Sequence, residues 1–357
     1  GCRDGDPRRT PRGALTAPPA TDADRPVSRL DLGTTAINPA SRKHPRVSDL
    51  SSETDRSVPS RGGSDDPVCD RDAGARSGYA AFVDELSARA RVVDLLALCL
   101  PPIALGAVFT LPRATRRSLA FAYLDPTPLS AFTAHYVHLG ADHLLGNLVG
   151  YGLLAGVGYA LAALSGRRRL FFTALATYLV AFPFALSALN LAVPRNAVGF
   201  GFSGINMALS GLLPILWYCF LRDRFAPAAP LAALPALFFG LVGWIALLAL
   251  PVSTEGIGLA GLSIGVAGAL LALLYAASSG VGIPRSPRKR AKSVASRPGY
   301  GDLLAVGAVV AVGYPVVGFP ADPAGGGSVV NLYVHLLGFC LGFIGPFALL
   351  AEGAFDG

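Results

Sequence analysis

Residues 144–165 read LLGNLVGYGLLAGVGYALAALS and contain no charged side chain. A helix of about 20 apolar residues crosses the hydrocarbon core of a bilayer. A backbone inside lipid must also satisfy its own hydrogen bonds, and a helix does this within one segment. The stretch therefore predicts a membrane-spanning helix, and its many small residues indicate that it packs closely against other helices.

Similar apolar runs make up most of the chain after residue 91. The whole sequence is 52% hydrophobic and only 15% charged, whereas soluble domains are about 25% charged, so the composition argues against a wholly soluble protein. We predict an all-α, polytopic membrane bundle over 91–352 with about eight transmembrane helices. The seven further runs lie at about 92–111, 170–193, 203–221, 228–251, 257–278, 303–319 and 329–351.

Residues 1–90 have a different composition. They are rich in Pro, Gly, Ser, Arg and Asp, and they show no sustained apolar period. Such a segment buries too little apolar surface to offset its conformational entropy, so we expect a disordered cytoplasmic tail. Within it, residues 78–91 predict a short amphipathic helix that leads to the membrane.

The charges predict the orientation. Residues 91–357 hold 16 Lys and Arg against 9 Asp and Glu, which accounts for the whole net charge of +7. With both termini in the cytoplasm, the basic loops 167–169, 222–224 and 285–297 lie inside, as the positive-inside rule requires. Loop 112–143 departs from the rule, because it carries three arginines, and we expect it to lie along the interface. We predict a multi-pass protein of the cell membrane and no nucleic-acid partner.

Polar side chains inside such helices are costly and mark functional sites. The run from His138 to Asn147 places His143 and Asn147 four residues apart, on one helical face. Gly201 and Gly204 flank Ser203 in the sequence GFSG at the start of another helix. In the last helix, His335 shares a face with two glycines, Gly338 and Gly342.

These three motifs together resemble the rhomboid family of intramembrane serine proteases. The resemblance covers about 92–351 and implies a rhomboid-like core, with Ser203 as nucleophile and His335 as general base. It implies that His143, Asn147 and the backbone N–H of Ser203 stabilise the oxyanion. It further implies that His138 shapes the pocket and that the motif glycines allow the serine and histidine helices to pack closely.

The order of the helices supports the pairing of Ser203 with His335. Three predicted helices separate the helices that carry them, so both helices cross the membrane in the same direction and both side chains lie in its outer part. Rhomboids usually have one helix at this place, and we expect the added pair at the periphery. Two further differences are Met207, where many members have Tyr, and His135, which matches no motif and which we interpret as interfacial.

The predicted activity is therefore a serine endopeptidase that cleaves transmembrane segments of single-pass membrane proteins within the lipid bilayer. A Ser–His dyad requires no cofactor, and the sequence shows no metal-ligand pattern. The alternative is a non-proteolytic rhomboid-like protein that binds membrane clients. An eight-helix transporter is a weaker hypothesis, because it predicts an internal repeat that the sequence lacks.

Overall fold

The computed structural model describes residues 67–193, 196–250, 256–280, 292–322 and 330–355, which belong to one compact unit. Helices dominate it, and the strands in these ranges are only two residues long. The predicted all-α architecture is confirmed.

Seven of the described helices are long and apolar enough to cross a membrane, and a bent pair raises the number to eight. The pair replaces the predicted run 170–193: α6 (Arg168–Val180) and α7 (Phe182–Asn190) meet at 50°. Pro183 causes the break, because it is the second residue of α7 and has no N–H to continue the hydrogen bonding of α6. The seven single helices are α2 (Val92–Phe109), α5 (Ala141–Leu164), α8 (Ser203–Phe225), α9 (Leu234–Ala249), α10 (Gly256–Ser278), α12 (Tyr300–Gly318) and α13 (Leu332–Ala351).

The helix predicted over 78–91 is longer than expected. Helix α1 (Pro67–Arg89) begins at Pro67, so the last part of the expected disordered tail is helical. An ion pair holds its end, with Arg224 Nη2 of α8 2.5 Å from Glu85 Oε1. Hydrogen bonding to Arg224 keeps the pKa of Glu85 below its usual value. Residues 1–66 lie outside the described part of the chain.

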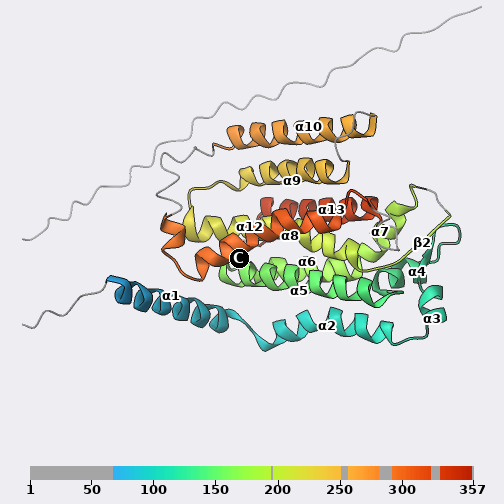
Figure 1. Ribbon diagram of the computed structural model, residues 1–357, viewed down its shortest axis with the longest axis horizontal. Coiled ribbons are helices and arrows are strands. Elements are labelled where there is room, and N and C mark those ends of the chain that lie inside the picture. Colours follow the sequence, from blue (N-terminus) through green and yellow to red (C-terminus); the bar gives the residue numbers. More distant parts are fainter. Residues whose placement is uncertain (1–66, 194–195, 251–255, 281–291, 323–329, 356–357) are drawn as a thin grey trace, which may run out of the picture. The chain divides into compact units, whose positions relative to one another are not determined.

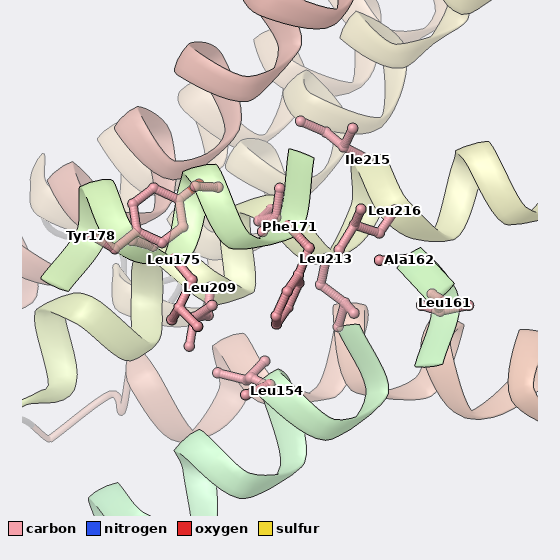
Figure 2. Packing of buried hydrophobic residues seen from close by; sticks show 14 of the residues in the cluster. Leu154, Leu161, Ala162, Phe171, Leu175, Tyr178, Leu209, Leu213, Ile215 and Leu216 are labelled. Atoms are coloured by element: carbon pink, nitrogen blue, oxygen red, sulfur yellow. The ribbon is translucent and has the colours of Figure 1, made fainter. Parts of the chain in front are cut away.

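Helix α8 is the centre of the bundle, with 89% of its span buried, against 17% for α2 and α10. It packs on α5, α6, α12 and α13 (Figure 1). Figure 2 shows the apolar contact among α5, α6 and α8, where leucines interdigitate with two aromatic rings. The contributing residues are Leu154, Leu161, Phe171, Leu175, Tyr178, Leu209, Leu213 and Leu216.

Helix α2 is attached to this centre by polar contacts as well as by the buried side chain of Leu105. Asp94 is buried, and its carboxylate binds the Arg168 guanidinium through both oxygens, with Nη2 2.5 Å from Oδ1. The Tyr159 hydroxyl donates to the same carboxylate at 2.8 Å. The contacts of Asp94 with Arg168 and Tyr159 explain how the largely exposed helix α2 is held against α5 and α6.

Of the three described spanning helices between α8 and α13, α10 lies outside the core. Helix α10 packs chiefly on α9, and Gly243 and Gly268 allow their backbones to approach closely. Figure 1 shows α10 on the side of α9 away from α8. The third helix, α12, packs on α8 and α5. Helix α10 is peripheral, as expected. Helix α9 is not, because its Leu241 and Ile245 are buried together with Phe339 of α13. Helices α8 and α13 are in direct contact.

The loop that departs from the positive-inside rule is folded against the bundle. It contains α3 (Arg113–Ser118), β1 (Phe121–Ala122), α4 (Pro128–Thr133) and the 3₁₀ turn η1 (Ala134–Tyr136). Strand β1 pairs antiparallel with β2 (Val198–Gly199), just before α8. Arg116 donates to the His138 carbonyl oxygen at 2.5 Å, and its guanidinium lies 4.3 Å from the Phe109 ring centre. One of the three arginines thus has a structural role.

Candidate active site

The start of α8 is positioned by a glycine and a histidine. Gly201 has φ +113°, a conformation that favours glycine, and its N–H donates to the Ala134 carbonyl at 2.9 Å. A Cβ at Gly201 would lie 2.7 Å from Cε1 of His143. The N–H of Phe202 donates to Nε2 of the fully buried His138 at 3.4 Å. These contacts place Ser203 as the first residue of the helix.

The histidine helix meets α8 through glycines. A Cβ at Gly338 would collide with the Gly204 carbonyl oxygen, and one at Gly342 with the carbonyl oxygen of Ala208. At Gly204 itself, a Cβ would lie 2.9 Å from Cγ1 of Val334. The two backbones therefore touch, and the separation of α8 and α13 is set by the absence of side chains.

This close packing brings Ser203 and His335 together. The Ser203 Oγ lies 2.8 Å from His335 Nε2, although the two residues are 132 apart in the sequence. His335 is 6% exposed, and its Nδ1 lies 2.6 Å from the Gly318 carbonyl oxygen. A carbonyl only accepts, so Nδ1 must carry the proton. Nε2 is then free to accept the proton of the Ser203 hydroxyl.

The carbonyl that accepts from His335 Nδ1 belongs to Gly318, the last residue of helix α12. Carbonyls in the last turn of a helix have no partner within it, and the helix dipole makes that end negative. Both effects favour a protonated His335 when Nε2 accepts a proton. The Phe319 ring lies edge-on to the imidazole, 6.0 Å between ring centres. Neither Gly318 nor Phe319 was predicted from the sequence, because no motif links the end of α12 to His335.

Met207 has no aromatic ring to place against His335. Its side chain is 1% exposed and packs against α12, where a Cβ at Gly318 would lie 2.9 Å from its sulfur. The aromatic contact comes from Phe319 instead. Where many rhomboids have Tyr, this chain has Met207, and the aromatic ring beside His335 is that of Phe319.

The dyad opens into a cavity of about 910 Å³. The predicted oxyanion donors His143 and Asn147 line it together with Ser203 and His335. Asn147 Nδ2 donates to the His143 carbonyl at 2.9 Å, one turn earlier in α5. A largely apolar cavity with a few convergent polar groups is typical of a site for a small molecule or a peptide segment.

A second serine–histidine pair lies in the same wall. His135 Nε2 is 3.2 Å from Ser187 Oγ, and both residues line the cavity. The Ser187 hydroxyl donates its hydrogen to the Ala131 carbonyl at 2.8 Å. The interpretation of His135 as interfacial was wrong, since it is 8% exposed and packed inside the protein. Burial lowers its pKa to about 4.

The described residues contain no cluster of three or more His, Cys, Asp or Glu side chains that could hold a metal ion. No protein-family model, no curated protein and no solved structure matches this chain. Its site must therefore be interpreted from its own chemistry.

Proposed function

We propose that this protein is an intramembrane serine endopeptidase of the rhomboid type. The observation that carries the proposal is the path from Ser203 Oγ to His335 Nε2, with Nδ1 held by the Gly318 carbonyl. A serine hydroxyl is a weak nucleophile until a base accepts its proton, and an imidazole held in this tautomer is suited to that role.

In the first half-reaction, Ser203 Oγ attacks the carbonyl carbon of the substrate while His335 Nε2 takes the hydroxyl proton. The tetrahedral oxyanion is stabilised by the N–H of Ser203, the imidazole of His143 and the amide of Asn147. Ser203 begins α8, so its N–H has no intrahelical acceptor. The intermediate collapses as the C–N bond breaks, and His335 returns the proton to the leaving amine.

In the second half-reaction, water attacks the acyl-enzyme ester and His335 accepts one of its protons. Collapse breaks the ester bond, releases the carboxyl product and returns the proton to Ser203. No cofactor takes part in either half. Water reaches the site through the cavity, whose wall is lined by polar groups from α5, α7, α8 and α13.

The substrates of this proposal are single-pass membrane proteins. Ser203 begins α8 and His335 lies in the first turn of α13, so both sit near the same end of the bundle. The loop charges assign that end to the outer face of the cell membrane, with both termini in the cytoplasm. A peptide bond must leave its helix before attack, which favours substrates with small or helix-destabilising residues near the cleavage site.

Labelling with a fluorophosphonate tests the nucleophile directly. We expect covalent labelling of wild-type protein in detergent and none of Ser203→Ala. Ser210→Ala is the matched control, because Ser210 is on the same helix and fully buried, and it should label normally. Equal labelling of wild type and Ser203→Ala would contradict the proposal. Cleavage of a panel of single-pass substrates then separates a protease from a client-binding protein.

A further inference from the structure

Asn206 is a fully buried amide one turn after Ser203 in α8. Its Nδ2 donates to two atoms of Asn147 on α5, the backbone oxygen at 3.0 Å and the side-chain Oδ1 at 3.2 Å. Gly150 of α5 leaves room for this contact, because a Cβ there would lie 3.2 Å from Asn206 Nδ2.

The contact with Asn206 fixes the orientation of the Asn147 side-chain amide. Asn147 Oδ1 accepts from Asn206, and one hydrogen of its Nδ2 goes to the His143 carbonyl. A carboxamide nitrogen carries a second hydrogen, for which the described residues offer no acceptor. Asn147 lines the cavity, whereas Asn206 lies behind it, outside the lining. The free N–H is therefore available to a ligand in the cavity.

Asn206 itself is not arranged for maximal stability. Its Oδ1 is buried without a hydrogen-bond partner among the described residues. An unsatisfied buried acceptor destabilises the folded state, and a leucine of similar size would bury no such acceptor. A polar residue kept at such a position despite its cost is typical of a functional role.

We propose that Asn206 is a positioning residue that holds the Asn147 amide with its N–H toward the oxyanion. This inference rests on the proposed function. Without Asn206, the Asn147 side chain can rotate and present Oδ1 to the cavity, where an oxygen repels the developing negative charge. Misplacement of a catalytic group by about 1 Å can cost a hundredfold in rate.

The test is a double-mutant cycle on substrate cleavage by the full-length protein in detergent. We expect Asn206→Leu to lower kcat by about ten- to a hundredfold with little change in KM. The double variant Asn206→Leu with Asn147→Ala should be no slower than Asn147→Ala alone. A purely structural role would instead multiply the two losses. Ser210→Ala, one turn further along α8 and equally buried, should keep the wild-type kcat.

An unchanged kcat in Asn206→Leu, or multiplied losses in the double variant, would overturn the inference. Thermal unfolding reports whether each variant is folded. If Asn206→Leu is unfolded, Asn206→Ala replaces it in the same double-mutant cycle. If the wild type cleaves substrate and the two losses multiply, only the proposed role of Asn206 is refuted. A wild type that cleaves nothing removes the proposed protease function and this inference together.

Discussion

At the scale of single residues, hydrogen bonding distinguishes the two serine–histidine pairs in the cavity. Ser187 gives its hydrogen to the Ala131 carbonyl, so its hydroxyl has no proton for His135. Among the described residues, the Ser203 hydroxyl donates to the His335 ring nitrogen alone, and the Gly318 carbonyl sets the tautomer of that ring. The first pair is therefore structural, and the second has the arrangement of a nucleophile and its base.

Removing either member of the dyad should abolish cleavage. We expect Ser203→Ala and His335→Ala each to lose at least about 10⁴-fold in kcat, because the nucleophile and the base act as one unit. Cleavage of a single-pass substrate measures this, with thermal unfolding as the check on folding. Residual activity above about 1% in a folded variant would exclude that residue from the dyad.

The oxyanion donors should have smaller effects. His143→Ala or Asn147→Ala is expected to lower kcat by about 10²–10³-fold if that donor acts alone, and by less if the three donors share the charge. Steady-state kinetics of both single variants and the double variant provide the measurement. If the double variant cleaves at the wild-type rate, this face of α5 serves only helix packing.

Acid should destabilise the protein through two buried histidines. Burial lowers the pKa of His135 and of His138 to about 4, against about 6.5 in the unfolded chain. The unfolded state therefore binds more protons between these values, so stability is full above pH 6.5 and falls as pH drops toward 4. Unfolding temperatures from pH 7.5 to 4.5 should show this loss, and His135→Leu should reduce it. An unchanged slope in that variant would contradict the prediction for His135.

At the scale of elements, the active-site distance depends on how closely α8 and α13 pack. A Cβ at Gly338 would collide with the Gly204 carbonyl, whereas a Cβ at Gly345 on the same helix meets nothing within 4 Å. The contact is backbone to backbone, so no side chain can move aside. The two glycines thus differ sharply in the cost of adding one methyl group.

Gly338→Ala should separate the two helices and break the Ser203–His335 hydrogen bond. We expect a loss of about 1–3 kcal/mol in stability, typical of overpacking, and a loss of cleavage larger than the stability change explains. Gly345→Ala should be neutral or slightly stabilising, because alanine is the better helix former. Unfolding and cleavage assays on both variants test this. Similar behaviour of the two variants would show that close packing at Gly338 is unimportant.

At the scale of the whole molecule, α12 connects the two sides of the proposed topology. Ser296 precedes α12 and Ala321 follows it, and both are exposed. The positive-inside rule assigns Ser296, within the basic loop 285–297, to the cytoplasm and Ala321 to the outside. Three described spanning helices separate α8 from α13, so both cross the membrane in the same direction. The prediction that Ser203 and His335 lie in the outer part of the membrane depends on this assignment.

Single cysteines test the assignment in a background in which the five native cysteines are replaced by serine. An impermeant thiol reagent added to intact cells should label Ala321→Cys, and it should label Ser296→Cys only after permeabilisation. The first variant is the positive control for the second. Labelling of Ser296→Cys in intact cells would reverse the orientation and place the dyad on the cytoplasmic side.

The amino-acid sequence by itself determined the membrane helices and the pair of residues worth testing. Long apolar runs leave the backbone no alternative to helices in lipid, and an odd number of intervening helices puts Ser203 and His335 on one side. The bend at Pro183 was not predicted, because a proline inside an apolar run changes the local structure without changing the composition. The start of α1 at Pro67 was not predicted either, because residues 67–77 show no apolar period.

Only the tertiary structure decided what surrounds the dyad. The Gly318 carbonyl, the Phe319 ring and the amide of Asn206 act across helices that are distant in sequence. The Gly318 carbonyl and the Phe319 ring belong to no motif, since a backbone carbonyl is present at every residue. Asn206 is a polar side chain inside an apolar run, but the sequence does not show that it faces Asn147. The glycine contact of α8 with α13 likewise leaves no space for another helix between them, so α9 packs beside these helices and α10 packs chiefly on α9.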